Sequence, residues 1–466
     1  MTDYAMEQQL VFDAELLARY DVSGPRYTSY PTAPQFSESF DEQMYRNTIA
    51  ESNGDFLARP LSIYIHIPFC NTVCYYCGCN KIVTKDRRKA IDYLSHLHQE
   101  IAMQAEMFDG DRTVNQIHLG GGTPSFIDNS SLAALMNELH VHFPIAGDDV
   151  GEYSIEIDPR EVDAESVKIL RDIGFNRLSI GVQDLDDSVQ LAVNRVQSER
   201  ETFDVINAAR ANDFRSVSVD LMYGLPNQTI DSFKRTLDRV IEVQPDRLSL
   251  FNYAHMPTLF KPQRRINEED LPSAVTKLEI LKQSSEQLQQ SGYVYIGMDH
   301  FARPDDELAI AQREGKLQRN FQGYSTHGDC DLLALGVTAI GQTRNSFSQN
   351  YRDIEPYYEA LDAGRLPIFR GMTLSEDDRI RGRVIQELIC HFNLDFEVIN
   401  RRFEINFKDY FAKELSELQT MQQDGLLQIH ANSIEVLPVG RLLIRNICMM
   451  FDAYLQNTSQ QFSKVI

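Results

Sequence analysis

The sequence of 466 residues contains no tryptophan, and no apolar run in it approaches the roughly 18 residues that a membrane-spanning helix needs. Its first residues, from Met1 onward, hold neither a basic run nor an apolar core, so we expect no signal peptide and a cytoplasmic protein. Positive charge is scarce, since 45 Lys and Arg stand against 68 Asp and Glu, for a net charge of −23. We therefore expect no binding to nucleic acid or membranes, although a local basic patch is compatible with a small anionic substrate.

Cysteine is also rare, but four of the seven cysteines stand within ten residues, at Cys70, Cys74, Cys77 and Cys79. Without a secretory context, thiols so crowded indicate a metal site rather than disulfides. Zinc sites usually take two separate Cys-x-x-Cys pairs, whereas the first three thiols on one short loop can hold three corners of an iron–sulfur cube. Cys79 could in principle bind the fourth iron, but it follows Cys77 so closely that both sulfurs would hardly reach the same cube. A zinc knuckle or a set of buried free thiols is the alternative.

The chain around and after these cysteines alternates between strand and helix patterns. Expected strands cover residues 61–69, 114–119, 152–157, 177–182, 216–222 and 247–251, and expected helices cover 88–107, 131–143, 164–173, 200–211, 230–243 and 272–290. Such units imply parallel strands with right-handed crossovers, and six in a row predict a barrel or a barrel left partly open. Polar and glycine-rich residues follow the strands, at the end where parallel barrels place their sites.

Four regions are expected along the chain: an N-terminal arm with helices (1–58), the barrel (59–300), a flanking region (301–369) and a helical C-terminal domain (370–466). The arm contains the stretch Arg26-Tyr27-Thr28-Ser29-Tyr30-Pro31, which has no helix or strand period and predicts an ordered loop. In the last region we expect helices over 377–390, 395–402, 408–424 and 441–455, and a hairpin from 426–430 and 434–437. This pattern resembles a winged helix, and in so acidic a chain it predicts a lid or packing domain rather than a DNA-binding one.

The spacing Cys70-x3-Cys74-x2-Cys77 resembles the signature of the radical S-adenosylmethionine (SAM) superfamily. With Ile65-His66-Ile67-Pro68-Phe69 before it and Cys79 after it, the motif resembles the family of oxygen-independent coproporphyrinogen III oxidases. That resemblance extends along most of the chain and implies an open six-stranded (β/α)6 partial TIM barrel. It also implies a [4Fe–4S] cluster on the three cysteines, with SAM on the remaining iron. The implied reaction is the decarboxylation of two propionates of coproporphyrinogen III to vinyl groups by a 5′-deoxyadenosyl radical.

The resemblance also implies site residues and two SAM molecules. For the first SAM it implies contacts from Tyr64, Gly121, Gly122, Thr123, Glu156 and Ile340. For the second it implies Tyr76, Gly122, Thr123, Gln183, Arg195, Asp220 and Ala254, with Phe321 and Gln322 nearby. Tyr64, Glu156 and Cys79 are expected to serve catalysis. The alternatives are a hydrogen-bonded carboxylate at a strand end for Glu156, and core packing for Ile340 and Ala254.

A substrate with four carboxylates needs cations, and the candidates are Arg26, Arg264, Arg265, Arg303 and Arg319. We expect a monomer that receives electrons from a donor such as a flavodoxin or a ferredoxin.

Two other functions remain open. One is a haem chaperone of the same branch, but such proteins carry His-Asn-x-x-Tyr-Trp in a late loop, where this chain has Arg319-Asn320-Phe321-Gln322-Gly323-Tyr324 and no tryptophan at all. They also lack the Arg26–Pro31 stretch. The other is a non-catalytic electron-transfer protein in which Cys79 supplies a fourth cluster ligand.

Overall fold

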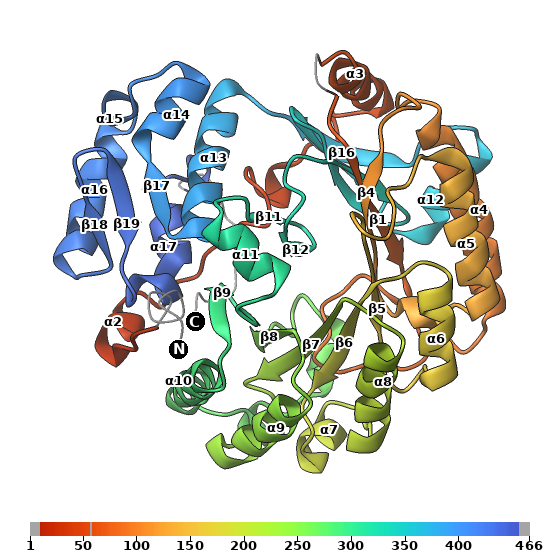
Figure 1. Ribbon diagram of the computed structural model, residues 1–466, viewed down its shortest axis with the longest axis horizontal. Helices are drawn as coiled ribbons and strands as arrows, with labels where there is room; N and C mark the ends of the chain where they lie inside the picture. The colour runs from red at the N-terminus through yellow and green to blue at the C-terminus, as the bar shows by residue number, and fades with distance from the viewer. Residues whose placement is uncertain (1–9, 56–57, 456–466) are drawn as a thin grey trace.

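The structure, a computed structural model, describes residues 10–55 and 58–455 and is built around a strongly curved sheet (Figure 1). The residues at Met1, on which the absence of a signal peptide was inferred, lie outside the described part. Within that part, no helix is both long enough and apolar enough to cross a membrane.

The six predicted strands form the parallel centre of this sheet and lie side by side in chain order. They are β1 (Leu61–Ile67), β4 (Val114–Gly121), β5 (Glu152–Ile157), β6 (Arg177–Gln183), β7 (Ser216–Tyr223) and β8 (Arg247–Asn252). The prediction of an open, parallel six-stranded partial barrel is therefore confirmed.

The sheet continues beyond both ends of this parallel centre, to twelve strands in all among the described residues. Next to β1 lie β13 (Asp331–Leu335), which is parallel to it, and then the antiparallel β14 (Ile340–Gln342), β15 (Ser346–Asn350) and β16 (Ile368–Thr373). Next to β8 lie the antiparallel β10 (His300–Ala302) and β9 (Val294–Gly297). Most of these added strands are short, so they carry too few residues for a period-2 pattern to reveal them.

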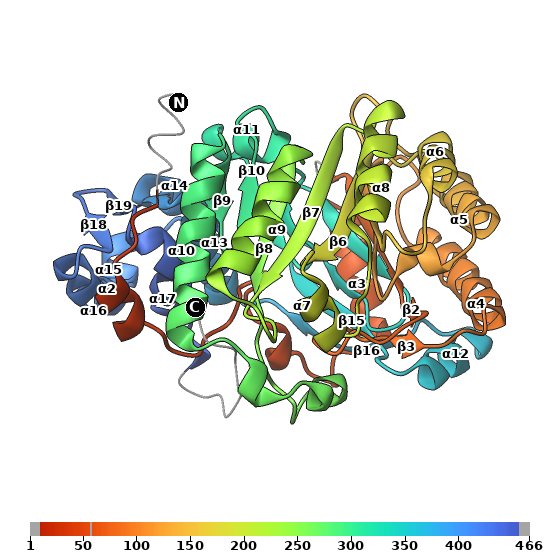
Figure 2. The ribbon, with the colours of Figure 1, turned by 90° about the horizontal axis from the view of Figure 1, so that it is seen from below.

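Helices cover the outer face of the barrel (Figures 1 and 2). They are α4 (Arg88–Ala105), α5 (Asn129–His142), α6 (Ala164–Asp172), α7 (Asp187–Ala192), α8 (Glu199–Ala211), α9 (Ile230–Glu242) and α10 (Ala274–Gln290), with α12 (Ile354–Asp362) later in the chain. α11 (Glu307–Arg313) instead lies beside β9, toward the C-terminal region. α9 shows why these segments are helical. Phe233, Leu237 and Val240 recur at helical spacing and are buried, and the Thr229 hydroxyl caps the helix by accepting a hydrogen bond from the Ser232 amide.

The inner face of the barrel is unusually polar, and strict alternation along the strands produces it. On β5, Tyr153, Ile155 and Ile157 are buried while Ser154 and Glu156 between them are only partly buried. Strands β6 and β7 repeat this pattern, with Ser179, Gly181, Ser218 and Asp220 at the partly buried positions. Because successive side chains point to opposite faces, the polar set faces inward. Most parallel barrels fill this space with branched apolar side chains, so a polar interior indicates room for a ligand.

The C-terminal region packs against the sheet edge through α13 (Glu376–His391), which contacts β9 and a small inner hairpin of β11 (Gln318–Asn320) and β12 (Gly323–Ser325). It continues with α14 (Phe396–Phe403), α15 (Phe407–Tyr410), α16 (Ala412–Gln423), α17 (Ile444–Met449) and a sheet of β17 (Asn393–Asp395), β18 (Leu427–Ile429) and β19 (Ser433–Val436). Figure 1 shows this region lying across the open side of the barrel.

Two helix predictions in this region are wrong. The helix expected over 408–424 is divided at Phe411, whose fully buried ring packs among other aromatic rings. The closing helix expected over 441–455 is α-helical only from Ile444 to Met449. The chain leaves the helix there, and the next residues bind the N-terminal arm: Asp452 accepts a hydrogen bond from the Tyr27 hydroxyl, 3.0 Å, and the Ala453 amide donates to the Tyr30 hydroxyl, 3.0 Å.

The N-terminal arm lies between the barrel and the C-terminal region. It carries α2 (Ala14–Arg19) and α3 (Glu42–Asn53), and between them the side chains of Tyr27 and Tyr30 are buried. Arg445 donates hydrogen bonds to the backbone oxygens of Gly24 and Pro25. The expectation of an ordered loop is therefore confirmed, and the arm is part of the packed structure.

Candidate active site

The cluster loop follows β1 directly, and its thiols come from one short, well-anchored segment. Cys70 ends the two-residue strand β2 (Phe69–Cys70), which pairs with β3 (Ile82–Val83) and so closes the loop at its base. The Asn194 side chain donates to the Val73 oxygen, 2.8 Å, and the Tyr75 amide donates to the Val193 oxygen, 2.9 Å. These bonds hold the loop against the segment that follows α7.

The chemistry of this loop fits an iron–sulfur cube. Burial raises the pKa of the Cys70 thiol to about 11, with the Thr123 hydroxyl, 3.4 Å from its sulfur, opposing the rise and the thiols of Cys77 and Cys74 adding to it. A hydrogen bond from Cys79 lowers the pKa of Cys77 to about 5. Among the described residues, no three His, Cys, Asp or Glu side chains are gathered closely enough for a single metal ion. A cube binds each thiolate at a different iron, so its ligands stand apart.

A glycine turn after β4 passes beside the cluster loop. The Gly122 amide donates to the Ile67 oxygen, 2.8 Å. Gly121 has a φ of +117°, and a Cβ atom there would lie 2.7–2.9 Å from the His66 ring, while one on Gly122 would lie 2.8–2.9 Å from the backbone of Pro68 and Phe69. Only glycine fits such a turn, and it leaves backbone groups open to a ligand.

Glu156 on β5 lies beside this turn. Its carboxylate accepts from the Gly121 amide, 3.2 Å, and lies 3.2 Å from Nε2 of His118, yet the side chain remains 44% exposed. The sequence placed Glu156 and the glycine turn on different strands, and the register of β4 against β5 brings them together. A carboxylate so placed can still accept hydrogen bonds from a ligand.

Tyr64 and two histidines form a ring-lined wall on the inner face of β1 and β4. The Tyr64 hydroxyl lies 3.1 Å from Nδ1 of His66, whose Nε2 lies 3.1 Å from the Asn80 oxygen in the cluster loop. The Tyr64 ring stacks on His118, with centroids 5.8 Å apart. Burial lowers the pKa of His66 to about 4, so this imidazole is neutral at physiological pH.

A buried ion pair lies under the second cluster cysteine. Arg195 pairs with Asp158, 2.9 Å, donates to the Gly181 oxygen, and places Nη1 3.7 Å from the sulfur of Cys74. Arg160 also pairs with Asp158, 2.6 Å, and lies 4.0 Å from the same sulfur. Two guanidiniums beside one cysteine place positive charge at this corner of the loop, which suits a negatively charged cluster.

Asp220 and Gln183 extend the site across β6 and β7. Burial raises the pKa of Asp220 to about 6, and Ser179 donates to its carboxylate, 3.3 Å. Gln183 has a φ of +68°, and its Oε1 is buried without a hydrogen-bond partner. A buried acceptor without a partner is costly unless a ligand satisfies it.

The positions of Tyr76, Ala254 and Ile340, also predicted to contact SAM, do not distinguish a ligand contact from core packing. Tyr76 packs in a small core that covers the loop with Tyr253 and Ile266, and its backbone oxygen accepts from Gln263, as does that of Ala254. Ile340 begins β14 and is half-buried.

Phe321 and Gln322 form the turn of the β11–β12 hairpin. The Phe321 ring lies edge-on to Phe36 and Phe347, and Nε2 of Gln322 is buried without a partner. These positions are compatible with a ligand contact and with core packing alike.

The five predicted substrate arginines are not gathered in one place. Arg26 pairs with Asp299, Arg264 donates to the Pro257 oxygen, Arg265 lies over the Tyr75 ring and Arg303 pairs with Asp305. Arg319 lies over the Tyr324 ring in a cavity that contains further arginines.

Sequence reasoning did not identify His66, His118, Ser154, Asp158 or Arg160 as parts of this site. The alternation on β5 contained a signal, because any polar residue two positions from Glu156 shares its face. His118 lies opposite both Tyr64 on β1 and Ser154 on β5 in the sheet. That register is set by strand pairing, which a single strand pattern does not reveal.

Comparison with known proteins gives two family matches within the chain. Residues 64–240 match the model of the radical SAM superfamily, and residues 374–443 match that of the HemN C-terminal domain. The first contains the cluster loop, the glycine turn, Glu156 and Asp220.

Curated relatives and one solved structure match nearly end to end. The chain is 53% identical over 456 residues to oxygen-independent coproporphyrinogen III oxidase of Pseudomonas aeruginosa, covering 98% of this chain and 99% of the relative. It is 51% identical over 461 residues to the protein of the same name from Escherichia coli, with 98% and 99% coverage. The solved structure, entitled "Coproporphyrinogen III oxidase (HemN) from Escherichia coli is a Radical SAM enzyme", superposes with a TM-score of 0.91 at 50% identity over 96% of this chain and 100% of that one.

Proposed function

The chain belongs to the family of oxygen-independent coproporphyrinogen III oxidases of the radical SAM superfamily, and from that premise we propose which of its residues carry the reaction. It is a radical SAM oxidoreductase of porphyrin and haem biosynthesis that acts on coproporphyrinogen III with a [4Fe–4S] cluster and SAM. The alternative of a haem chaperone is not favoured, because relatives that match at about half identity along the whole chain bear the oxidase name.

The chemistry required is the conversion of two propionates to vinyl groups. Each propionate loses a hydrogen atom from the carbon next to the ring, then carbon dioxide and one electron, which leaves a carbon–carbon double bond. Acid–base groups do not remove a hydrogen from so unactivated a position. When bound, the reduced cluster and SAM supply a 5′-deoxyadenosyl radical that takes this hydrogen atom.

The residues of one end of the barrel divide this task. Cys70, Cys74 and Cys77 would hold the cluster, and SAM would bind beside it. The Gly121–Thr123 turn and Glu156 hold the amino group of SAM, since a carboxylate and exposed backbone oxygens accept from an ammonium. Tyr64 and Ile340 flank the same molecule, and Cys79 stands beside the cluster in a catalytic role.

We assign a second SAM to the neighbouring strand ends. Tyr76, Gln183, Arg195, Asp220 and Ala254 line this position, with the Phe321–Gln322 turn nearby. Two unsatisfied buried amide atoms support the assignment, Oε1 of Gln183 and Nε2 of Gln322, because each lacks a partner that a polar ligand would supply.

Water and oxygen must be kept from a carbon radical, and the arm and the C-terminal region lie where they would do so. The rest of the proposal is a monomer in the cytoplasm that receives electrons from a flavodoxin or ferredoxin and binds neither nucleic acid nor membrane. The observation that carries the whole assignment is the meeting of the cluster loop, the glycine turn and Glu156 at one end of a polar-lined barrel.

The test is turnover by the anaerobically reconstituted protein. After loading with iron and sulfide, it is incubated with SAM, dithionite and coproporphyrinogen III, and the tetrapyrroles are analysed by mass. We expect the loss of two carboxyl groups per tetrapyrrole molecule and the formation of methionine and 5′-deoxyadenosine. Cluster assembly and SAM cleavage without any change in the tetrapyrrole would contradict the proposed substrate chemistry.

A further inference from the structure

An arginine-lined cavity of about 380 Å³ lies away from the cluster, between the edge of the sheet and the C-terminal helices. Its walls come from the turn after β14, the start of β11, the N-terminal arm and α13 and α14. Six arginines line it: Arg59, Arg319, Arg344, Arg379, Arg383 and Arg402. Only three carboxylates line it with them, Glu376, Asp378 and Glu404. In a chain with a net charge of −23, such a gathering of cations calls for an explanation.

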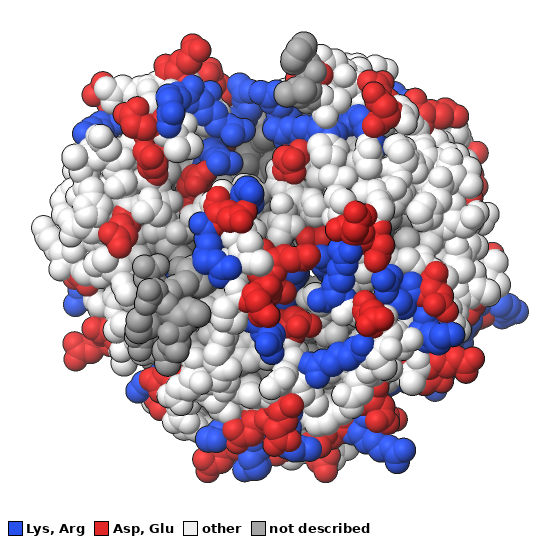
Figure 3. Space-filling view, in the orientation of Figure 1, with Lys and Arg blue, Asp and Glu red and all other residues white. Residues whose placement is uncertain are grey.

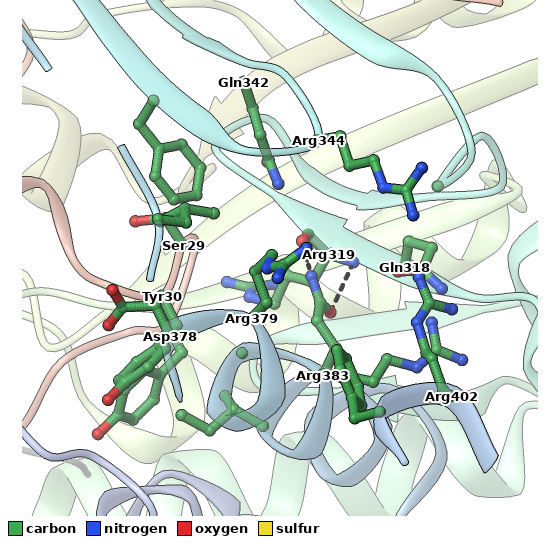
Figure 4. Close-up of a pocket in the computed structure, with 18 of the residues that line it drawn as sticks. Ser29, Tyr30, Gln318, Arg319, Gln342, Arg344, Asp378, Arg379, Arg383 and Arg402 are labelled. Atoms are coloured by element: carbon green, nitrogen blue, oxygen red, sulfur yellow. Dashed lines mark hydrogen bonds between the residues drawn. The ribbon is translucent and has the colours of Figure 1, made fainter. Parts of the chain in front are cut away.

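The arrangement is visible on the surface and in close-up. Figure 3 shows Lys and Arg side chains around a hollow between the region of α13 and that of β16. In Figure 4, Arg344 extends from the sheet side, and Arg379, Arg383 and Arg402 extend from the helices opposite. A second hollow of about 400 Å³ shares Arg59, Arg383 and Arg402 and adds Lys316.

Most of these arginines lack a counter-charge. Arg344 pairs with Asp55 and Arg383 with Glu387. Arg59, Arg319, Arg379 and Arg402 form no ion pair with any carboxylate of the described part of the chain, 10–55 and 58–455.

Arg319 gives the clearest evidence that this cavity binds an anion. Only 4% of it is exposed, its ring contact is with Tyr324 at 4.8 Å, and Nε and Nη1 have no hydrogen-bond partner. The Nε atoms of Arg379 and Arg383 are buried without partners too. A buried guanidinium without a partner is expensive, and a solvated surface does not explain it.

The arginines also act on one another and continue toward the barrel interior. Burial lowers the pKa of Arg402, and the charges of Arg383, Arg59 and Arg344 lower it further. Burial lowers the pKa of Arg26 to about 10, with Arg319 the next cause. Cations therefore run from the open cavity through Arg319 toward Arg26 on the arm, which is paired with Asp299, and an anion beside the arginines that have no such pair would relieve their repulsion.

The cavity lies at the opposite end of the barrel from the cluster. Arg59 precedes β1, whereas Cys70 follows it, and a seven-residue strand spans about 20 Å. SAM would occupy the part of the interior nearest the cluster, next to Glu156. A tetrapyrrole between SAM and the arginine cavity would present two propionates toward SAM and the other two toward the cavity.

We propose that this arginine cavity binds the propionates of coproporphyrinogen III that are not decarboxylated. The proposal rests on the function assigned above. Guanidinium groups match carboxylates in shape and charge and bind them through paired hydrogen bonds. Because the two distal propionates stay intact, a site that holds them keeps the ring bound through both decarboxylations.

The test replaces Arg379 and Arg402, singly, by glutamine. Arg319 is left in place because its loss would disturb the packing on Tyr324. The matched control is Arg200→Gln, on the exposed face of α8, where 89% of the side chain is exposed. We expect each cavity variant to raise the KM for coproporphyrinogen III in turnover with SAM by about ten-fold, and to raise equally the Kd measured by equilibrium binding without SAM. A ten-fold change corresponds to about 1.4 kcal/mol. Cluster iron and SAM cleavage should match the control, and Arg379→Lys should recover part of the affinity.

Inorganic phosphate serves as a small anion in a second arm of the experiment, at constant ionic strength. It should compete with coproporphyrinogen III in the wild type and compete less in the variants. Substrate binding equal to that of Arg200→Gln overturns the proposal, and so does phosphate binding at these arginines without competition. A wild-type protein that cleaves SAM but leaves the tetrapyrrole unchanged would instead contradict the proposed function, so the two failures are distinguishable.

Discussion

The carboxylate of Glu156 accepts a hydrogen bond from the backbone amide of Gly121, with the two atoms 3.2 Å apart. The two residues are 35 positions apart in the chain and belong to neighbouring strands. Their bond fixes the glycine turn relative to the inner face of β5 and leaves the carboxylate partly exposed. A ligand that enters at the end of β4 therefore meets a carboxylate and a bare backbone together.

Glu156→Gln should weaken SAM binding. The amide keeps the size of the side chain but loses the charge that attracts an ammonium, so we expect a loss of roughly ten-fold or more in affinity, on the scale of hydrogen bonds to charged groups. Equilibrium binding of SAM to the reconstituted protein measures this. Glu165→Gln on α6, at an exposed position, is the control, and equal affinity in the two variants would remove Glu156 from the SAM site.

Serine at Cys70, Cys74 or Cys77 should abolish the cluster, because each supplies one of three protein ligands. Serine at Cys79 should leave it assembled, although turnover is expected to fall. Bound iron and the EPR signal of the reduced protein report the outcome. Cys330→Ser is the control, since this partly buried thiol lies outside the loop. If Cys79→Ser fails to assemble a [4Fe–4S] cluster, then Cys79 is a ligand, and no open iron remains for SAM.

The raised pKa of Asp220, about 6, predicts a pH dependence of stability. Since the pKa in the folded chain lies above the unfolded value, the folded state keeps its proton longer, and stability falls as the pH rises from about 4 to about 6. The full effect is at most about 3 kcal/mol. Asp220→Asn should lack this fall, whereas Asp204→Asn, at an exposed site on α8, should keep it. Thermal midpoints of the cluster-free proteins at pH 5 and pH 7 test this, and parallel profiles for the wild type and Asp220→Asn would contradict it.

We expect Arg26 to pair with a propionate, so Arg26→Ala should raise the KM for coproporphyrinogen III. Loss of one partner of a fully buried charge pair costs roughly 2–5 kcal/mol. Because the Arg26 side chain is 36% exposed, we expect a smaller effect, an increase of about ten-fold. The structure pairs Arg26 with Asp299, so a purely structural role is the competing explanation. Asp299→Asn separates the two, since it breaks the same pair and leaves the cation. We expect an increased KM only for Arg26→Ala, and equal effects of both changes would assign Arg26 to holding the arm.

Local patterns in the sequence determined a large part of this protein. The cysteine spacing indicated a cluster, and six strand–helix units indicated a parallel barrel, because both signals lie within a few consecutive residues. Topology predicted a site at one end of the barrel, since carboxyl ends of parallel strands meet at one edge. The family resemblance, carried by local motifs, implied that Glu156, the glycine turn and Asp220 belong to it.

Only the tertiary structure decided what these residues touch. His118 lies between Tyr64 and Glu156 because strand register aligns them, and register depends on pairing between distant segments. The arginine cavity combines Arg59, Arg319 and Arg402 from three regions of the chain, and no local pattern unites them. The closing helix ended early because Asp452 and Ala453 bind the arm, more than 400 residues earlier in the chain. Sequence determines local periodicity and chemistry, whereas long-range packing decides which of those groups meet.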